Sequence, residues 1–342
     1  MNFVENYLAD HWDRLGLNWL GDAGGLSCLL ITPRFRASAN VLFFVLARGS
    51  KQPLLVAKIP RLPSANSSLE REAKSLENIH ACWAGGRDSI PRLIVFDRHR
   101  NCSLLLQTAL IGRPLDPAMI RSEFQSCTDL ATSWLAELHS ATAAEIPGAP
   151  LARLAAEAIT TLRTVLTLPP ERALLLRAQH LLASLDEARL PIVFEHGDFS
   201  SPNLLRLHDG RLGVLDWELA DPLGVPAADL FMFLNFAALS LRRARTVADC
   251  RASFDEAFFG SKAWTDRWIL DYAERTGLAR EWLRPLFVLC WTRYLTNLVR
   301  RLIPTDGMVA LDTLAWLRNG TYYSLWVHTI ENAALDHHPN WR

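Results

Sequence analysis

Five short apolar runs follow one another in the first third of the chain, separated by turn-forming residues. They cover residues 28–31, 41–45, 54–59, 91–97 and 103–107. Short runs rich in Val, Leu, Ile and Phe between turn signals are typical of β-strands. The pattern therefore predicts a small mixed or antiparallel sheet in this part of the chain.

A helical pattern interrupts these runs between residues 67 and 83. Its apolar positions recur every three or four residues at Leu69, Ala73, Leu76, Ile79 and Trp83. Glu72 falls on the same face, and a carboxylate on a buried face needs a cation. Lys58, inside the apolar run 54–59, needs a partner for the same reason, so we expect these two side chains to pair. The alternatives are that Lys58 reaches solvent from a sheet edge and that Glu72 is solvated at the margin of its face.

The pattern changes near residue 110, where Gly112 and Pro114 interrupt the strand signals. Apolar residues then recur at helical spacing through most of the chain, including residues 151–188 and the tryptophan-rich residues 250–335. We therefore expect an α+β fold with two domains, residues 1–110 and residues 111–342. Residues 1–20 carry spaced apolar residues and are expected to form an amphipathic helix over the first domain.

A polar loop follows the apolar run at residues 191–195, which is expected to be a short buried strand. The loop reads His196-Gly197-Asp198-Phe199-Ser200-Ser201-Pro202-Asn203. Two further strands, residues 204–207 and 211–215, are joined by Asp209-Gly210, a pair that favours a tight hairpin. Asp216 therefore leaves a strand close to the polar loop.

The side chains of Asp198, Asn203 and Asp216 offer carboxylate and amide oxygens, which are ligands that suit Mg²⁺. This set is typical of phosphoryl transfer, in which Asn203 and Asp216 would hold the metal. Asp198 would orient the attacking hydroxyl and accept its proton. The alternative is a His/Asp metal-hydrolase site. The other histidines considered for it lie in no metal-ligand spacing with His196, namely His80, His99, His139, His180 and His208.

Two motifs carry a resemblance to a known family, His196-Gly197-Asp198 with Asn203, and Asp216-Trp217-Glu218. They resemble the H-G-D-x-x-x-x-N and D-x-E segments of the aminoglycoside phosphotransferase and choline kinase group, which has a protein-kinase-like fold. The resemblance covers roughly residues 40–240. It implies a sheet-rich N-terminal lobe that binds ATP or another nucleoside triphosphate with Mg²⁺, and a helical lobe that binds a small-molecule hydroxyl acceptor.

The resemblance also implies roles for individual residues. Lys58 is expected to contact the α- and β-phosphates, with Glu72 orienting its ammonium group. His196 is expected to hold the loop rather than to do chemistry. Asp229, near the start of a predicted helix, is expected to bind free backbone N–H groups or to support the loop.

The connection between the first two strands, residues 33–40, lies where the resemblance places a hairpin over the nucleotide. It reads Pro-Arg-Phe-Arg-Ala-Ser-Ala-Asn and contains no glycine, so it lacks the glycine-rich loop that covers phosphates in kinases. Arg34 or Arg36 could offset phosphate charge, or both could be ordinary exposed residues. This connection supports the alternative of a non-catalytic nucleotide-binding or scaffold protein.

The composition of the chain limits the classes of partner that we expect. The chain has 36 Lys and Arg against 36 Asp and Glu, so no net field recruits nucleic acid or an anionic membrane. We recognise no secretion signal or apolar stretch that would span a bilayer, and the six cysteines form no C-x-x-C pair. The expected location is the cytoplasm. Acidic and basic residues are balanced beyond residue 249, so we expect an acceptor that carries at most one charge rather than a polycationic aminoglycoside.

Overall fold

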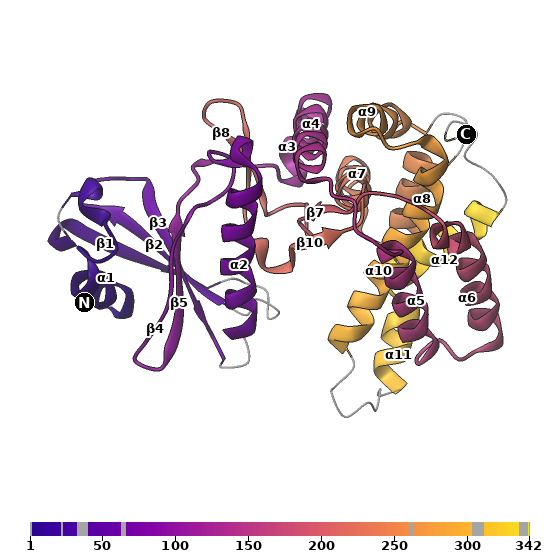
Figure 1. Cartoon of the computed structure of the whole chain (residues 1–342), viewed down its shortest axis with the longest axis horizontal. Coiled ribbons are helices and arrows are strands. Elements are labelled where there is room, and N and C mark those ends of the chain that lie inside the picture. Colours follow the sequence, from indigo (N-terminus) through magenta and orange to yellow (C-terminus); the bar gives the residue numbers. More distant parts are fainter. Residues whose placement is uncertain are drawn as a thin grey trace. The chain divides into compact units, whose positions relative to one another are not determined.

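The computed structural model describes residues 2–21, 23–32, 40–62, 66–259, 263–302, 311–334 and Trp341. These residues form two compact units (Figure 1). Unit 1 comprises residues 1–114, 196–198 and 202–222, and unit 2 comprises residues 115–195, 199–201 and 223–342. The chain therefore returns to unit 1 for two short segments after it has built part of unit 2. Arg34 and Arg36, expected near the nucleotide, lie outside the described residues.

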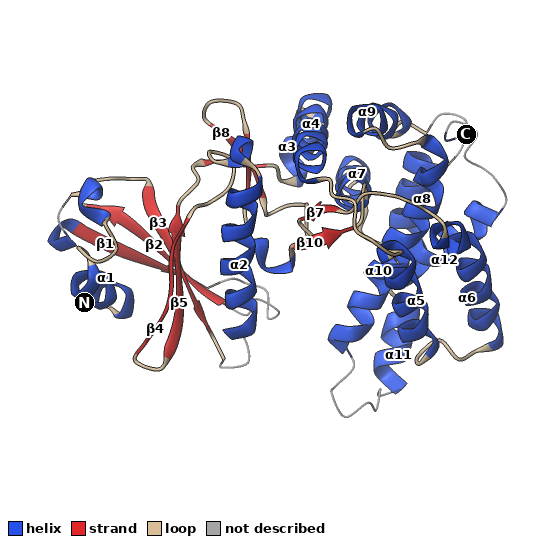
Figure 2. Cartoon of the chain, viewed as in Figure 1, coloured by secondary structure: helices blue, strands red, loops and turns tan. Residues whose placement is uncertain are grey.

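Unit 1 is built on a five-stranded sheet with the order β1-β2-β3-β5-β4, in which every neighbouring pair is antiparallel (Figure 2). Its strands are β1 (Leu26–Ile31), β2 (Asn40–Ala47), β3 (Pro53–Pro60), β4 (Leu93–His99) and β5 (Cys102–Thr108). The five strands expected from the apolar runs are all present. The prediction of a small antiparallel sheet is confirmed.

Two helices cover the opposite faces of this sheet (Figure 1). Helix α1 (Phe3–His11) packs on one face and α2 (Asn66–Cys82) on the other. Side chains alternate between the two faces of a strand, and β5 shows this directly. Leu104 and Leu106 pack with α1, whereas Leu105 packs with Leu69 and Ala73 of α2.

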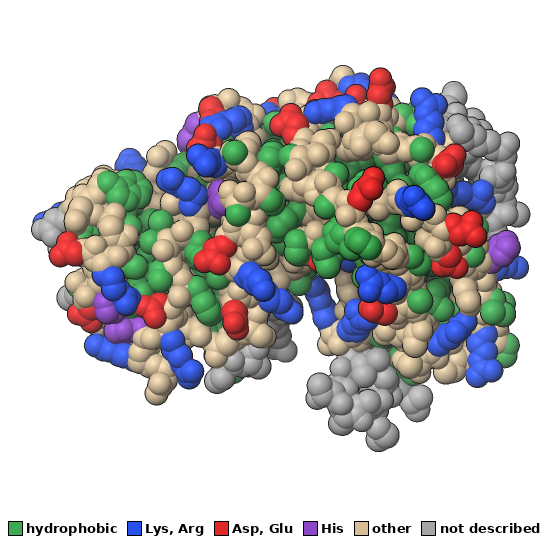
Figure 3. Space-filling view, in the orientation of Figure 1, with side chains coloured by type: hydrophobic (Ala, Val, Ile, Leu, Met, Phe, Trp, Pro, Cys, Tyr) green, Lys and Arg blue, Asp and Glu red, His purple; other side chains and the backbone are tan. Residues whose placement is uncertain are grey.

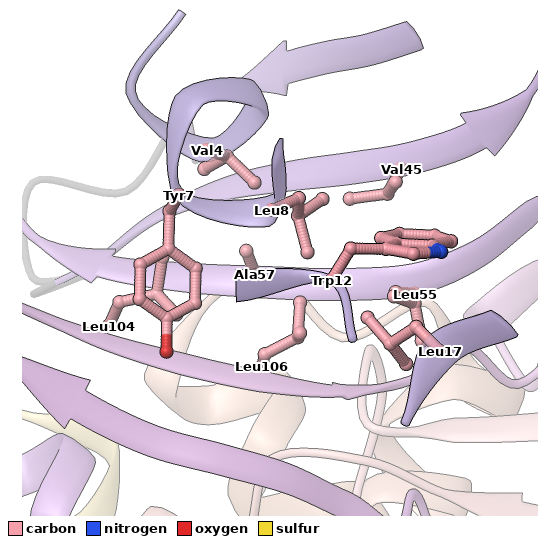
Figure 4. Packing of buried hydrophobic residues seen from close by; sticks show 10 residues of the cluster. All are labelled: Val4, Tyr7, Leu8, Trp12, Leu17, Val45, Leu55, Ala57, Leu104 and Leu106. Atoms are coloured by element: carbon pink, nitrogen blue, oxygen red, sulfur yellow. The ribbon is translucent and has the colours of Figure 1, made fainter. Parts of the chain in front are cut away.

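The core beneath α1 is wholly apolar apart from the hydroxyl of Tyr7 and the indole nitrogen of Trp12 (Figure 4). It comprises Val4, Tyr7, Leu8, Trp12, Leu17, Val45, Leu55, Ala57, Leu104 and Leu106. The helix expected over residues 1–20 is shorter than predicted, because α1 ends at His11 and a 3-10 turn, η1 (Leu17–Leu20), follows. Gly16, with φ of 64°, permits the turn between them. Trp12 and Leu17 still reach the core.

The later segments of unit 1 add a three-stranded sheet with the order β6-β8-β9. Its strands are β6 (Gly112–Pro114), β8 (Leu204–Leu207) and β9 (Leu212–Val214). The expected hairpin between β8 and β9 is present, and Gly210 has the positive φ, 85°, that such a turn requires. A 3-10 turn, η6 (Trp217–Leu219), follows β9 and packs against α2. Unit 1 also contains η2 (Ala23–Gly25) and η4 (Ala84–Gly86).

Unit 2 is mostly helical and also contains a two-stranded sheet of β7 (Val193–Glu195) and β10 (Asp221–Gly224), the latter beginning in unit 1 (Figure 2). Its α-helices are α3 (Pro117–Ser122), α4 (Phe124–Thr142), α5 (Pro150–Arg163), α6 (Pro169–Leu182), α7 (Ala228–Arg242), α8 (Val247–Phe258), α9 (Asp266–Thr276), α10 (Leu283–Leu302), α11 (Leu311–Arg318) and α12 (Thr321–Ala334), with 3-10 turns η5 (Ala183–Asp186) and η7 (Arg280–Trp282).

Two details of unit 2 do not follow from the hydrophobic pattern. The helical spacing at the end of the chain corresponds to two helices, α11 and α12, with a break between Arg318 and Thr321. The segment that contains Pro222 and Gly224, residues that usually favour a loop, forms strand β10. A Cβ at Gly224 would lie 2.1 Å from the Cβ of Glu195, so only glycine allows this close approach to β7.

All six cysteines lie in the described part of the chain and are free thiols. Within that part, the structure contains no helix with the length and apolar character that a membrane crossing requires.

Candidate active site

Lys58 lies at the centre of the candidate site, near the end of β3. Its Nζ donates to both carboxylate oxygens of Glu72, at 2.6 and 2.8 Å, and to Oδ1 of Asp216 at 2.7 Å. Glu72, on α2, is fully buried, and Lys58 is 6% exposed. The contact expected from the helical phase of Glu72 is therefore present. The direct contact between Lys58 and Asp216 was not expected from the sequence.

The charges of Lys58, Glu72 and Asp216 shift one another's pKa values. Burial alone would lower the pKa of Lys58, but the carboxylates of Glu72 and Asp216 outweigh it and hold the pKa above its usual value. Burial alone would raise the pKa of Asp216, and the Lys58 ammonium outweighs it and lowers that pKa. For Glu72 burial dominates, and it raises the pKa to about 7 despite the neighbouring ammonium. A positive charge is thus fixed beside the carboxylate that the sequence indicated as a metal ligand.

The imidazole of His196 holds the loop that begins at this residue through two hydrogen bonds. The His196 ring is buried, and its Nε2 lies 2.8 Å from the carbonyl oxygen of Leu215. Its Nδ1 accepts the backbone N–H of Asp198 at 3.2 Å, so the ring proton is on Nε2 and is donated to Leu215. This ring therefore ties the loop to the segment that follows β9.

Asn203 fixes the side chain of Asp198. Its Nδ2 donates to the backbone oxygen of Asp198 at 3.0 Å and to Oδ2 of the same residue at 2.9 Å. Because both contacts use the amide nitrogen, the amide oxygen points in another direction. Backbone pairing between Leu215 N and Asn203 O, at 2.8 Å, joins the loop to the strand end that precedes Asp216.

Two residues of the site adopt left-handed backbone conformations. Gly197 has φ of 81°, and a Cβ there would lie 2.5 Å from the carbonyl oxygen of Leu219, so no other residue fits without a shift of the backbone. Asp216 has φ of 64°, a conformation that aspartate tolerates better than most residues. This conformation begins η6, in which Glu218 accepts a hydrogen bond from the hydroxyl of Ser68 on α2.

A cavity of about 460 Å³ opens beside these groups, within unit 1. Its walls are mainly apolar, and Lys58, Asn203 and Asp216 are among its polar residues. The lining residues are Asn40, Leu42, Phe44, Pro53, Val56, Lys58, Gln107, Thr108, Ala109, Leu110, Gly112, Pro202, Asn203, Leu205, Leu215, Asp216 and Glu218. This volume and this mixture are typical of small-molecule and cofactor sites.

Asp229 is the one predicted site residue that lies in unit 2; the other six lie in unit 1. It stands in the first turn of α7, is buried, and has Oδ2 3.8 Å from Nε2 of His139. His139 in turn contacts the Tyr272 hydroxyl at 2.6 Å, and that hydroxyl accepts the N–H of Ala227. His139 is therefore a core histidine, and Asp229 belongs to the buried cluster at the start of α7.

The oxygen atoms of Asn203 and Asp216, two residues that line the cavity, fit a magnesium ion. The amide oxygen of Asn203 and the second carboxylate oxygen of Asp216 are hard oxygen ligands. In the part of the chain that the structure describes, no three His, Cys, Asp or Glu side chains form a group that could hold a metal ion by themselves. A metal here would complete its coordination with water and substrate phosphates, which is usual for Mg²⁺.

Comparison with solved structures shows which fold this is. Aminoglycoside phosphotransferase APH(4)-Ia, as a thermostable mutant in ternary complex with AMP-PNP and hygromycin B, matches at 13% identity with a TM-score of 0.57, covering 98% of this chain and 100% of the other. Choline kinase LicA from Streptococcus pneumoniae matches at 15% identity with a TM-score of 0.55, covering 94% and 99%. The predicted α+β, two-lobe kinase-like fold is confirmed.

A search of curated proteins gives no match. The family model described as APH, phosphotransferase enzyme family, matches residues 36–286. This range includes Lys58, Glu72, the loop at His196 and the segment at Asp216. Because the match covers well over half of the sequence, the chain belongs to the phosphotransferase enzyme family.

Proposed function

We propose that this protein transfers the γ-phosphate of ATP, or of another nucleoside triphosphate, to a hydroxyl group of a small molecule. The observation that supports this most directly is the position of Lys58. Its ammonium is held between Glu72 and Asp216 at the wall of a cavity that Asn203 also lines. Phosphoryl transfer is catalysed chiefly by positioning and by fixed charge, and this cluster provides both.

The nucleotide would occupy the cavity with its base at the end of β5 and its phosphates near Lys58. Its base would lie at the end of β5, near Ala109 and Leu110 and against the apolar side chains of Phe44 and Val56, which line the same cavity. Lys58 would contact the α- and β-phosphates, and Glu72 would keep its ammonium in place. The solved structure of APH(4)-Ia with AMP-PNP shows that a protein of this fold holds an ATP analogue.

The hydroxyl acceptor would be activated by Asp198. Its carboxylate, oriented by the amide of Asn203, would position the acceptor hydroxyl and take its proton while the new phosphate–oxygen bond forms and the bond to the leaving nucleoside diphosphate breaks. Asn203 and Asp216 would hold Mg²⁺, which when bound neutralises phosphate charge. His196 and Asp229 would support the site without touching substrate.

The free state of all six cysteines agrees with a reducing location, which we propose is the cytoplasm.

Replacement of the proposed base tests this function. Asp198→Ala should lower kcat by at least 10²-fold, the usual contribution of a positioned base, while the Kd for Mg·ATP stays within about twofold, because the base acts on the acceptor. Asp209→Asn, on the exposed β8–β9 turn, is the matched control and should keep full activity. Turnover is measured as ADP release across a panel of amino alcohols, sugars and antibiotics. An Asp198→Ala enzyme that kept most of its activity would show that the base is misassigned.

The alternative is a non-catalytic nucleotide-binding or scaffold protein. Its support is the glycine-free sequence of residues 33–40, of which residues 33–39 lie outside the described part. A protein without turnover has no chemical need for Lys58, Glu72, Asp198, Asn203 and Asp216 together, so the family and the site favour the enzyme. Mg²⁺-dependent ATP binding without turnover of any acceptor in the panel would favour the scaffold.

A further inference from the structure

Phe199 is the residue that follows the proposed base in the loop between β7 and β8. Asp198 is exposed, whereas the side chain of Phe199 is fully buried. The two neighbours lie in different units of the fold, Asp198 in unit 1 and Phe199 in unit 2. The chain therefore passes from one unit to the other directly after the proposed base.

Hydrogen bonds hold Asp198 on the side of unit 1. His196 accepts the N–H of Asp198, and the amide of Asn203 donates both to the carbonyl oxygen and to the carboxylate of Asp198. These three bonds come from residues of the same loop or its end. The side chain of Phe199 supplies an anchor of a different kind, in the core of unit 2.

The ring of Phe199 contacts aromatic rings from two helices of unit 2. Trp134 of α4 stacks on it, with ring centroids 5.5 Å apart and an angle of 20° between the planes. Phe233 of α7 meets it edge to face, with centroids 6.0 Å apart. Trp134 is 6% exposed and Phe233 is fully buried. Aromatic pairs at such distances attract one another beyond the gain from burial.

Helix α4 also holds the chain before the loop. The hydroxyl of Thr142, at the end of α4, accepts the backbone N–H of Phe194 on β7 at 3.1 Å. The same helix therefore contacts the chain on both sides of Asp198, through Thr142 before it and through Trp134 after it. A change in the contact at Trp134 would leave the first of these anchors in place.

We propose that Trp134 is a positioning residue for phosphoryl transfer, which stacks on Phe199 and so fixes the backbone next to Asp198. The inference rests on the proposed role of Asp198 as the base. Consecutive Cα atoms are only about 3.8 Å apart, so a shift of Phe199 moves Asp198 with it. A misplacement of about 1 Å can lower a rate about 10²-fold. Trp134 thus acts through Phe199 rather than through contact with a substrate.

The test separates the ring of Trp134 from its contribution to stability. Trp134→Phe keeps an aromatic ring, and Trp134→Leu removes it. Trp268→Leu is the matched control, because Trp268 is also 6% exposed and also contacts α4, at Phe124. ADP release gives kcat and the KM of the acceptor, and calorimetry gives the Kd for Mg·ATP. All assays are run below the lowest melting temperature among the variants.

Trp134→Leu should lower kcat about 10- to 100-fold while the Kd for Mg·ATP and the KM of the acceptor stay within about threefold, because positioning the base is a transition-state task. Trp134→Phe should keep kcat within about threefold of the wild type, because a stacked ring remains. Trp268→Leu should lower the melting temperature about as much as Trp134→Leu and keep full kcat. A loss of stability alone would not produce this difference in kcat.

A double-mutant cycle tests whether Trp134 acts through Phe199. Phe199→Leu keeps an apolar side chain but removes the ring. Trp134→Leu combined with Phe199→Leu should lower kcat no more than the larger of the two single losses, because both changes remove the same contact.

Three results would overturn the proposal. The first is a kcat of Trp134→Leu equal to that of Trp268→Leu. The second is a loss of Mg·ATP affinity as large as the loss of kcat, which would indicate damage to the whole site. The third is additive losses in the double-mutant cycle. An Asp198→Ala variant that kept most of its turnover would instead contradict the proposed base itself, a result distinct from these three.

Discussion

Lys58 has a structural role in the buried core and a proposed role in phosphate binding. Its ammonium is buried in an apolar strand, where an unpaired charge would be severely unfavourable. Two carboxylates compensate for the lost hydration. Glu72 is fully buried, so it depends on Lys58 as much as Lys58 depends on it. The pair is therefore expected to be needed for folding as well as for phosphate binding.

The first prediction follows from this mutual dependence. Lys58→Met should lower the free energy of unfolding by about 3–5 kcal/mol, because it leaves the Glu72 carboxylate buried without its partner. Removing both charges, in Lys58→Met with Glu72→Leu, should restore most of the stability and leave the enzyme without turnover. Urea unfolding at neutral pH measures the first effect and ADP release the second.

The matched control is Lys74→Met on the exposed side of α2, which should change the unfolding free energy by less than about 0.5 kcal/mol. If the double variant were as unstable as Lys58→Met alone, the loss would come from packing rather than from an unpaired charge.

At this scale the sequence predicts contacts that follow a repeating pattern. The pairing of Lys58 with Glu72 follows from helical phase, because Glu72 shares a face with Leu69 and Leu76. The contact between Lys58 and Asp216 does not, because it depends on the left-handed backbone at Asp216. The contact from Asn203 to Asp198 likewise depends on the turn of an irregular loop. Such loop geometry leaves no periodic signal in the sequence.

At the scale of elements, the loop between β7 and β8 depends on close backbone packing at Gly197. Gly197 and Gly210 have nearly the same φ, 81° and 85°, but their surroundings differ. A Cβ at Gly197 would meet the backbone oxygen of Leu219, whereas a Cβ at Gly210 would meet open space. The two glycines separate the effect of a positive φ from the effect of a steric clash.

The second prediction uses this pair. Gly210→Ala should cost about 1 kcal/mol of stability, the penalty for a left-handed alanine, and should leave turnover within twofold. Gly197→Ala should cost clearly more and should lower kcat about 100-fold, because the loop must move and misplace Asp198. Both variants are compared by urea unfolding and by ADP release. Equal losses in the two variants would mean that packing against Leu219 does not constrain the loop.

Helix α1 is tied to the sheet by a hydrogen bond at the edge of the apolar core. The hydroxyl of Tyr7 donates to Oδ2 of Asp97 on β4 at 2.8 Å, and Arg14 contacts the same carboxylate oxygen at 2.6 Å. Burial, together with the nearby Asp97 carboxylate, raises the pKa of Tyr7 to about 12. Folding therefore favours the neutral phenol.

The third prediction concerns pH. Because the folded pKa of Tyr7 lies above the unfolded value of about 10, its contribution to stability is complete below pH 10 and is lost as pH rises toward 12. Tyr7→Phe should lower the free energy of unfolding by about 1 kcal/mol at pH 8, and the difference from the wild type should shrink above pH 10. Urea unfolding across this range measures it.

Asp97→Asn provides the check on the Tyr7 prediction. In that background Tyr7→Phe should cost less, because the hydroxyl has lost its charged acceptor. A difference between wild type and Tyr7→Phe that stayed constant from pH 8 to pH 11 would contradict the raised pKa.

Elements with a clear hydrophobic period could be predicted from the sequence, and elements set by distant contacts could not. All five strands of the large sheet and helix α2 follow from alternation or helical spacing. Strand β10 contains Pro222 and Gly224, which normally indicate a loop, and forms because β7 offers a partner. The break before α12 is another local feature that the helical spacing of the apolar residues does not indicate.

At the scale of the whole molecule, the sequence indicates which chemistry the protein performs but little about the acceptor. The two motifs are short and local, so they can be read directly. We expect acceptor recognition to depend on side chains brought together from several helices, and no single spacing in the sequence would record such a site. The charge of those helices can be compared between the sequence and the structure.

Several acidic side chains of unit 2 are paired with arginine. Arginine nitrogens lie within 4.0 Å of the carboxylates of Asp129, Glu137, Glu157, Glu171, Glu195, Glu256 and Asp271. Red and blue side chains are accordingly interspersed over the helices on the face that Figure 3 shows. A polycation is attracted by carboxylates whose charge is not already neutralised, and such pairing reduces that attraction.

The fourth prediction is that the acceptor is neutral or carries at most one charge, so aminoglycosides such as kanamycin should be poor substrates. Uncharged sugars or singly charged amino alcohols should give the highest kcat/KM in the acceptor panel, and their KM should change little as salt is raised, because screening acts on charge pairs. Steady-state ADP release at low and high salt measures both. Efficient phosphorylation of kanamycin with a KM that rises steeply with salt would mean that a carboxylate-lined acceptor site exists despite the pairing, and would overturn this prediction while leaving the proposed role of Asp198 intact.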